Sequence, residues 1–323
     1  MRPDPLRSAE PEAGSVGVWL PDDVSYADTI AVAQRAFHRP SSRLARRLLP
    51  GRAASNALAV ARMRRRGMRP REIASALIWL ETAYYFGITT VLDISGNESP
   101  VTELLAGRPR PRPRPAPAQR PSITGALIAT NEASRIGGAL DSLSGFVDDL
   151  VVLDGGSTDG TPEVAASYGA RVYHRPFDRD FAAQRNALLD HVHTPWVFML
   201  DCDERVPAEL GREVLEALGR TDVDTIVMPW LNLVEDDPVP TRWPDPHTRV
   251  HRTALRYRRP VHEYILARTA IYLPMNGPCI QHHKTKARSV RQLRLYDSID
   301  PSQTTEVDLE RMERWKEDEA AGE

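Results

Sequence analysis

The sequence predicts an α/β protein built on a mostly parallel sheet with helices on both faces, preceded by a small helical domain. An uninterrupted apolar run, WVFML at residues 196–200, is followed at once by acids at Asp201, Asp203 and Glu204. Such a run is typical of a buried strand in a parallel sheet. Around it, strand-like and helix-like segments alternate, which indicates βαβ units. A proline- and arginine-rich stretch at residues 107–121 separates these segments from the helical patterns before it.

The bulk composition is that of an ordinary globular protein. The 323 residues leave room for about two domains, and 41% of them are apolar and 27% charged. A net charge of −2 excludes a globally basic chain, so we predict no nucleic-acid partner. Cys202 and Cys279 stand in no C-x-x-C pattern, which argues against a disulfide framework or a zinc site. The polar, proline-rich start of the chain lacks the apolar core of a signal peptide, so we expect a cytoplasmic protein.

Before the linker the pattern is helical. We expect residues 1–20 to be disordered and residues 21–106 to form a helical accessory domain. Within it, residues 73–92 hold a single charge, Glu81, and follow an arginine-rich run, a length and flank that membrane spans share. Apolar residues at helical spacing and the central carboxylate favour a buried helix of a small bundle over membrane contact. The alternating prolines of residues 107–121 favour an extended, semi-rigid linker.

Residues 122–295 are predicted to form the α/β domain, with residues 296–323 as a helical tail. Thr161 is expected to cap the second helix of the domain, with Pro162 in its first turn and Gly169 at its end. The predicted elements are, in order, a strand at 123–129, a helix at 131–146, a strand at 149–153, a helix at 161–169, a strand at 170–174, a helix at 180–192 and a strand at 196–200.

Polar residues follow three of these strands at their carboxyl ends, where open α/β sheets bind ligands. T-N-E follows the first strand at 130–132, D-G-G-S-T-D-G the second at 154–160, and D-C-D-E the fourth at 201–204. Glycines in the second loop let the backbone approach a ligand closely, although the same letters also suit a plain turn. Asp201 and Asp203 can both reach one cation or sugar phosphate, or can be solvated acids at a strand end.

Together with Q-R-N at residues 184–186, these motifs stand in the order and spacing of a known family. The stretch from about residue 123 to about residue 210 closely resembles family 2 glycosyltransferases of the GT-A fold, the fold of nucleotide-diphospho-sugar transferases. The nearest subgroup is the one related to lipopolysaccharide core glucosyltransferases. A looser similarity continues to about residue 295 through RWPDPHTRVHR, PVHEYI and PCIQHHKTKA. Residues 1–120 show no resemblance to the family.

The resemblance implies a donor site and a metal site. Arg185 is expected to approach the donor diphosphate. Asp203 is expected to bind Mn²⁺ or Mg²⁺, with Asp201 as a second ligand or a ribose contact. His282, or less favourably His283, is expected to complete the metal shell. The residues expected to hold the nucleotide sugar are Thr130, Asn131, Glu132, Asp154, Ser157, Asp159, Arg185 and Asp201.

The resemblance also implies an inverting transfer, which needs a general base on the face opposite the leaving group. Glu263 of PVHEYI is the expected base, with Glu204 and Asp245 as alternatives. We expect a UDP-sugar donor and an acceptor that is a peptide or other natural product, or a glycolipid or polysaccharide precursor. The helical domain is the candidate for recruiting that acceptor.

Three other functions compete with this interpretation. A catalytically inactive GT-A module that only binds is disfavoured by the intact D-C-D-E. A nucleotidyltransferase is disfavoured because the first strand is not followed by a glycine-rich, lysine-containing loop. A methyltransferase is disfavoured because its glycine loop should follow the first strand of the domain, and here that loop follows the second.

Overall fold

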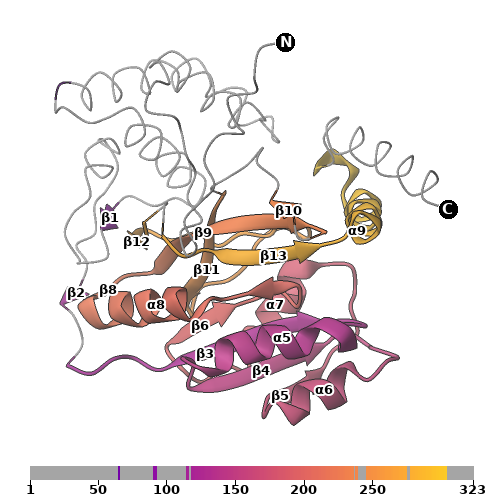
Figure 1. Ribbon diagram of the computed structural model, residues 1–323, viewed down its shortest axis with the longest axis horizontal. Coiled ribbons are helices and arrows are strands. Elements are labelled where there is room, and N and C mark those ends of the chain that lie inside the picture. The colour runs from indigo at the N-terminus through magenta and orange to yellow at the C-terminus, as the bar shows by residue number, and fades with distance from the viewer. Residues whose placement is uncertain are drawn as a thin grey trace.

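The computed structural model describes residues 65, 90–92, 114–115, 118–235, 237–238, 245–274 and 277–303. Over these residues the chain forms one mixed sheet of eleven strands flanked by helices, and a second sheet of two short strands (Figure 1). The disorder expected at residues 1–20 lies outside the described residues. So do the helices expected in the accessory domain, apart from the helical residue Arg65.

Four parallel strands with intervening helices form the first half of the large sheet, as the alternating sequence pattern predicts. These elements are β3 (Ile123–Ala129), α5 (Ala133–Ser144), β4 (Asp149–Asp154), α6 (Thr161–Ser167), β5 (Arg171–His174), α7 (Phe181–Leu189) and β6 (Trp196–Met199). The strands lie in the order β6-β3-β4-β5. Because Ala129 pairs with Asp154, the loops that follow β3 and β4 leave the sheet side by side.

The chain then builds the other half of the sheet from strands of both directions. Its elements are β7 (Glu204–Arg205), α8 (Ala208–Arg220), β8 (Thr221–Asp222), β9 (Thr225–Val234), β10 (Asp237–Pro238), β11 (Asp245–Arg252), β12 (Thr269–Tyr272), β13 (Ile280–Lys284), α9 (Lys286–Ile299) and the 3-10 helix η2 (Pro301–Gln303). β11 lies between β6 and β9 and is antiparallel to both. β13 runs parallel to β9 and antiparallel to β7, which brings the end of the domain back to the loop after β6.

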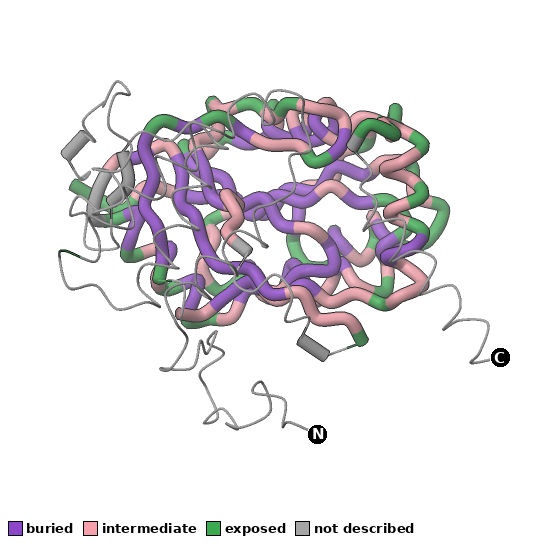
Figure 2. The backbone as a smooth tube through the Cα atoms, turned by 90° about the horizontal axis from the view of Figure 1, so that it is seen from above, coloured by how far each residue is buried: buried purple, intermediate pink, exposed green. Residues whose placement is uncertain are grey.

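The hydrophobic core has two layers, one on each face of the parallel strands. In β6, Trp196 and Phe198 belong to one layer and Val197 and Met199 to the other, the alternation of a strand that is buried on both sides. Helices α5, α6 and α8 contribute to the first layer and α7 to the second. Figure 2 shows buried backbone through the middle of the molecule and exposed backbone toward its rim. The predicted sheet with helices on both faces is confirmed.

Two short strands come from the segment before the α/β domain. β1 (Thr90–Leu92) pairs in parallel with β12, and β2 (Arg114–Pro115) pairs antiparallel with β8. Both differ from expectation, because β1 falls in the region expected to be helical and β2 in the expected linker. The edge of β12 offers unpaired backbone groups, and a β-branched segment such as Thr90 and Val91 is suited to pair with them.

Two further differences concern the ends of helices. Thr161 is the first residue of α6, and Gly160 takes the cap position without a side-chain hydrogen bond. The Thr161 hydroxyl instead accepts a hydrogen bond from the backbone N–H of Glu132 at 2.7 Å, in the neighbouring loop. Gly169 ends the helix with a φ of +79°, as predicted. Helix α9 crosses residue 295, the expected limit of the domain.

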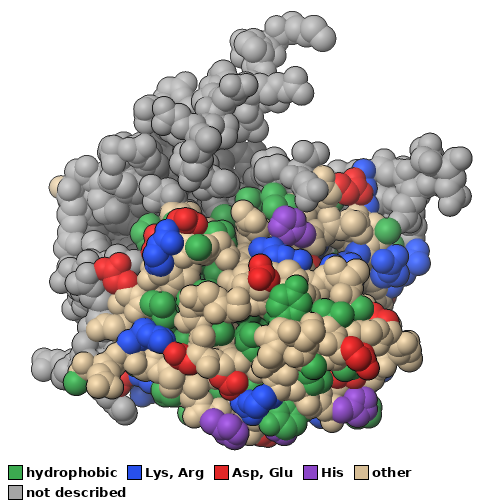
Figure 3. Space-filling view, turned by 60° about the horizontal axis from the view of Figure 1, so that its bottom comes forward, with side chains coloured by type: hydrophobic (Ala, Val, Ile, Leu, Met, Phe, Trp, Pro, Cys, Tyr) green, Lys and Arg blue, Asp and Glu red, His purple; other side chains and the backbone are tan. Residues whose placement is uncertain are grey.

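The surface of the described residues carries charges of both signs. Over the face shown in Figure 3, Lys and Arg side chains are interspersed with Asp and Glu side chains. No helix in the described ranges is long and apolar enough to cross a membrane. The segment 73–89, the greater part of the span considered above, lies outside those ranges.

Candidate active site

The loops after β3 and β4 are tied together into one rim at the carboxyl edge of the sheet. Asn131, at a φ of +56°, accepts through Oδ1 from the backbone N–H of Thr158 at 2.8 Å, and its own N–H donates to Ser157 Oγ at 2.9 Å. The carboxylate of Asp159 accepts from the backbone N–H of Ala133 at 3.2 Å. Three residues expected at the donor site, Asn131, Ser157 and Asp159, are thus brought together by hydrogen bonds that cross between the loops.

Asp154 lies beneath this rim, at the end of β4, with 4% of its surface exposed. Its carboxylate accepts from the backbone N–H groups of Gly156 at 3.0 Å and Ser157 at 3.1 Å, and it contacts His174 Nδ1 at 3.1 Å. Burial would raise the pKa of Asp154, but these hydrogen bonds outweigh it and hold the pKa below its usual value. The carboxylate is therefore ionised and acts as the fixed centre of the glycine loop.

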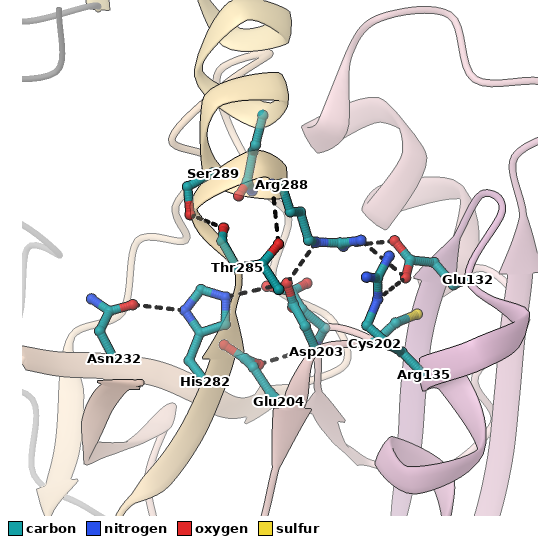
Figure 4. Close-up of polar contacts among 12 residues, drawn as sticks. Glu132, Arg135, Cys202, Asp203, Glu204, Asn232, His282, Thr285, Arg288 and Ser289 are labelled. Atoms are coloured by element: carbon teal, nitrogen blue, oxygen red, sulfur yellow. Dashed lines mark hydrogen bonds and ion pairs between the residues drawn. The ribbon is translucent and has the colours of Figure 1, made fainter. Parts of the chain in front are cut away.

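Asp203 and His282 form a pair with the properties of half a metal site. His282 Nε2 lies 3.4 Å from Asp203 Oδ2, and His282 Nδ1 lies 3.0 Å from Asn232 Oδ1 (Figure 4). Burial lowers the pKa of His282, so the ring is neutral at neutral pH. Nδ1–H can donate to the Asn232 oxygen, an arrangement that leaves the lone pair of Nε2 for a cation beside Asp203. Metal-binding histidines are typically held in this way by their second nitrogen.

This pair is incomplete as a metal shell. Within the described ranges, no group of three or more His, Cys, Asp and Glu side chains converges to hold a metal ion. Asp203 Oδ2 also accepts from Arg288 Nε at 3.1 Å. The residues therefore fit a cation that takes two ligands from the protein and the others from substrate and water, as Mg²⁺ does in phosphate-binding sites.

Arg288, in the first turn of α9, joins the ends of β6 and β3. Besides Asp203 it reaches Glu132, donating through Nη2 to Oε1 at 2.6 Å and through Nη1 to Oε2 at 3.3 Å. Arg135 donates to the same Glu132 carboxylate at 2.8 Å. Burial raises the pKa of Glu132 to about 7, and the hydrogen bond from Arg135 opposes the rise. The second guanidinium, that of Arg288, also favours the ionised form of Glu132.

The three residues of the Q-R-N motif, on α7, each hold a different partner. Gln184 donates to the backbone oxygen of Arg175 at 2.9 Å. Asn186 exchanges two hydrogen bonds with the backbone of Tyr257, at 2.8 and 3.0 Å. Arg185 lies between them, with 4% of its surface exposed. The motif therefore anchors its central arginine and also fixes the segment that follows β11.

Arg185 binds two carboxylates from opposite sides of the site. Nη2 donates to Asp201 Oδ1 at 2.7 Å and Nε donates to Glu263 Oε1 at 2.6 Å. Burial disfavours the cation, but the two carboxylates outweigh it and hold the pKa of Arg185 well above its usual value. Among the buried side-chain nitrogens of the described residues, Arg185 Nη1 has no hydrogen-bond partner. A buried guanidinium with an unused donor is suited to an additional anionic ligand.

Asp201 is held by a second arginine that sequence reasoning did not identify. Arg249 Nη2 donates to Asp201 Oδ2 at 2.7 Å and also to Glu204. Glu204 is fully buried, accepts from Trp230 Nε1 at 2.7 Å and accepts from the backbone N–H of Asp201 at 3.0 Å. Burial would raise the pKa of Asp201, but Arg185 and Arg249 hold it well below its usual value. Glu204 thus serves to position the loop after β6.

Glu263, the expected base, lies where the chain bends sharply. The preceding residue, His262, has a φ of +51°, a conformation that non-glycine residues seldom adopt. Its ring packs edge-on against Tyr296 of α9 at 5.3 Å between centroids. The Glu263 side chain is 14% exposed, and its Oε1 is oriented by Arg185. The side chain of Asp245, one alternative base, lies outside the described part of the structure.

Beside the rim, the charged side chains of the site form two adjoining groups, which join expected residues to arginines that were not expected. The Asp203 group comprises Asp203, His282, Glu132, Arg135 and Arg288, and the Asp201 group comprises Asp201, Arg185, Arg249, Glu204 and Glu263. The charge of His282 acts on Asp201, and the role of Asp201 as a second metal ligand stays a prediction. Arg249 stands inside the quoted segment RWPDPHTRVHR, and Arg288 directly follows the quoted segment PCIQHHKTKA, but neither segment marks its arginine as a partner of the D-C-D-E acids.

Comparisons with known proteins show a similarity to one family of enzymes. Residues 126–273 match the family model described as Glycosyl transferase family 2. A lipopolysaccharide core biosynthesis glycosyltransferase, LpsC of Rhizobium meliloti, is 33% identical over 101 residues, covering 30% of this chain and 37% of that protein. A TPR repeat-containing protein of Synechococcus elongatus is 30% identical over 144 residues, covering 43% of this chain and 34% of that protein. The chain thus spans about a third of the length of these relatives.

Among solved structures, the chain is similar to glucosyl-3-phosphoglycerate synthase from Mycobacterium tuberculosis in complex with Mn²⁺, UDP and glucosyl-3-phosphoglycerate. The identity is 26%, the match covers 35% of this chain and 44% of that one, and the TM-score is 0.28. The family match covers the rim, Q-R-N, D-C-D-E and the Glu263 segment, and it ends before His282 and Arg288. Residues 126–273 are therefore similar to glycosyl transferase family 2.

Proposed function

We propose that this protein is an inverting, metal-dependent glycosyltransferase that transfers a sugar from a UDP-sugar to an acceptor. The observation that carries the proposal is the Asp203–His282 pair at the carboxyl end of β6, adjoining the rim of the β3 and β4 loops, in a family 2 domain. This is the edge at which open α/β sheets bind nucleotides.

The nucleotide is proposed to bind along the rim. Asn131 and Asp154 stand on neighbouring strand ends with loops that are already ordered by hydrogen bonds. A site that is formed before binding loses little conformational entropy when the ligand arrives. The diphosphate would then extend from the rim toward the Asp203 group, with the unused Nη1 of Arg185 as one donor to it.

The metal is proposed to be Mn²⁺ or Mg²⁺, bound by Asp203 and His282. When bound, such a cation neutralises charge on the diphosphate of the leaving nucleotide. Asn232 fixes the histidine tautomer through the hydrogen bond at Nδ1. Asp201 remains a proposed second ligand or ribose contact, and its carboxylate is oriented by Arg185 and Arg249.

Glu263 is proposed as the general base. An oxygen or other nucleophilic atom of the acceptor attacks the anomeric carbon, and the carbon–oxygen bond to the diphosphate breaks with its electron pair passing to the diphosphate. The proton of the nucleophile moves to the Glu263 carboxylate. Arg185 fixes one oxygen of that carboxylate at 2.6 Å, which orients the group before the acceptor binds.

For the acceptor we keep the two classes that the sequence suggested. The relative LpsC is named for lipopolysaccharide core biosynthesis, which supports a glycolipid or polysaccharide precursor. A peptide or other natural product, recruited by the segment before residue 118, is the second class. Transfer assays with both classes of acceptor distinguish them.

The donor is tested first, by thermal-shift measurements on the full chain with UDP-, GDP- and dTDP-sugars, with and without Mn²⁺. We expect a UDP-sugar to raise the Tm, and Mn²⁺ to increase the rise, because a ligand that binds only the native state stabilises it. Asp203→Asn should abolish the metal-dependent part and lower donor turnover about hundredfold. Asp190→Asn, at a surface pair that is more than half exposed on the aspartate side, is the matched control and should change neither.

Other outcomes would contradict the proposal. A flat response to every sugar nucleotide excludes the donor site. Stabilisation by a donor without turnover in the presence of any acceptor or water indicates a binding module. Pyrophosphate exchange with a nucleoside triphosphate indicates a nucleotidyltransferase.

A further inference from the structure

We propose that Arg288 is a binding residue for the donor diphosphate, carried by α9 and held between Asp203 and Glu132 until the donor arrives. This inference deepens the proposed function and rests on it. Arg288 lies beyond residues 126–273, the segment that matches the family model. The assignment therefore comes from the contacts of this chain.

The backbone places Arg288 directly beside the D-C-D-E loop. β13 pairs with β7, and the backbone N–H of His283 donates to the Asp203 carbonyl at 2.8 Å, so the strand before α9 is fixed to the D-C-D-E loop. Thr285 caps α9 by accepting from the backbone N–H of Arg288 at 3.2 Å. The first turn of α9 is thereby placed over Asp203, as Figure 4 shows.

The guanidinium of Arg288 contacts acids at the ends of two strands. It donates to Asp203 through Nε and to both oxygens of Glu132 through Nη1 and Nη2. One cation thus spans the ends of β6 and β3, the gap that the diphosphate is proposed to cross. The Arg288 side chain is 21% exposed, against 5% for Asp203 and 11% for Glu132, so the arginine covers the acids on the solvent side.

The positive charge of Arg288 offsets the negative charge of the two acids beside it. Without Arg288, the carboxylates of Asp203 and Glu132 would lose a cation that contacts both of them, and they would repel an incoming diphosphate more strongly. A guanidinium that forks onto a carboxylate has the same donor geometry that suits phosphate oxygens. Lys284 and Lys286 precede it on the same segment, and the N-terminal end of α9 adds positive potential.

Arg288 and a metal cation would share one acceptor, the Oδ2 atom of Asp203. Asp203 Oδ2 accepts from Arg288 Nε and also faces His282 Nε2. A metal cation bound between Asp203 and His282 competes with Arg288 for that oxygen and repels the guanidinium. The diphosphate attracts it. Binding of the metal and binding of the donor therefore both favour movement of the Arg288 side chain away from Asp203 and Glu132 and onto the phosphate oxygens. The backbone of α9 stays in place.

The test separates metal affinity from nucleotide affinity. Binding of Mn²⁺ alone, of UDP in the presence of a chelator, and of UDP with saturating Mn²⁺ is measured by calorimetry on the full chain. Arg288→Ala should bind UDP about ten- to hundredfold more weakly, the range for loss of a charge-assisted hydrogen bond. The same variant should bind Mn²⁺ alone more tightly, several-fold, because its competitor for Asp203 is gone. Arg288→Lys should restore part of the UDP affinity.

Arg291→Ala, an exposed arginine one turn further along α9, is the matched control and should leave all three affinities unchanged. Equal weakening of UDP and Mn²⁺ binding by Arg288→Ala would mean that Arg288 only supports the site structurally, and unchanged UDP binding would overturn the proposal outright. If the wild-type chain binds UDP and only the variant prediction fails, the proposed function stands. If the wild-type chain binds no UDP with or without Mn²⁺, both fail.

Discussion

Two aspartates that are two positions apart have different surroundings. Asp201 is held by Arg185 and Arg249, whereas Asp203 faces His282 and Arg288. Each acid is thus oriented by side chains that lie far from it in sequence. A D-x-D motif shows where the acids are, but the arginines and the histidine around them decide which one is available to a cation.

Substitution of Arg249 measures how much the Asp201 group contributes to the free energy of unfolding. Arg249→Met removes a cation that contacts Asp201 and the fully buried Glu204, and breaking a buried pair leaves an uncompensated charge. We expect a loss of about 3 kcal/mol in the free energy of unfolding. Arg256→Met, which breaks an exposed pair with Asp190, should lose less than about 1 kcal/mol. Urea unfolding of the two variants makes the comparison, and equal losses would contradict it.

At the level of elements, the loops act through contacts between them. The β4 loop passes so close to Thr130 that any side-chain carbon added at Gly155 would clash with the Thr130 hydroxyl. Gly156, next to it, has a φ of +102°, which favours glycine. The two glycines of D-G-G therefore serve different needs, close approach for the first and backbone conformation for the second.

Gly155→Ala tests whether this approach matters for the nucleotide. The added methyl group must displace the Thr130 hydroxyl from its place at the rim, so we expect UDP to bind about tenfold more weakly, as small misplacements in a binding site do. Gly145→Ala is the control, since nothing lies within 4 Å of its added carbon and its φ is −72°. It should leave UDP affinity unchanged and keep or raise the Tm. Equal UDP affinity in both variants would contradict the expectation.

At the level of the whole molecule, two half-sheets meet between β6 and β11, and a buried histidine lies at this junction. His251 is fully buried in β11. Its Nδ1 lies 2.9 Å from the Arg252 carbonyl and its Nε2 lies 2.9 Å from the Tyr257 hydroxyl. The carbonyl can only accept, so Nδ1 carries the proton and Nε2 accepts from Tyr257. Burial accordingly lowers the pKa of His251 to about 4.

This shift predicts a pH dependence of global stability. With a folded pKa of about 4 and an unfolded value near 6.5, only the unfolded chain takes up the proton between these values. Stability should therefore fall as the pH drops through this window, by about 2 kcal/mol between pH 7.5 and pH 5 from this group. Urea unfolding at both pH values should show a smaller fall for His251→Gln, and an unchanged fall for His193→Gln at an exposed position. Identical pH dependence in all three proteins would contradict the assignment.

Much of the parallel half of the fold was predictable, because it is built from local units. The spacing of apolar residues in the segment 123–129 and in the helix after it indicates a strand and a helix. Crossover connections between parallel strands are almost always right-handed, which limits the possible topologies. The order β6-β3-β4-β5 then places the three polar loops on one edge. The mixed half of the sheet was not predicted, since β9, β11 and β13 pair across long stretches of chain whose partners no local pattern identifies.

By itself, the sequence determined the parallel sheet and the edge at which Asp154, Asp201 and Asp203 gather. Those features follow from side-chain periodicity and from motifs that are continuous in the chain. Only the tertiary structure decided the electrostatic partners, above all Arg249 on Asp201 and Arg288 on Asp203. A salt bridge depends on distances of a few ångströms between groups on separate elements, and sheet pairing, which is non-local, sets those distances.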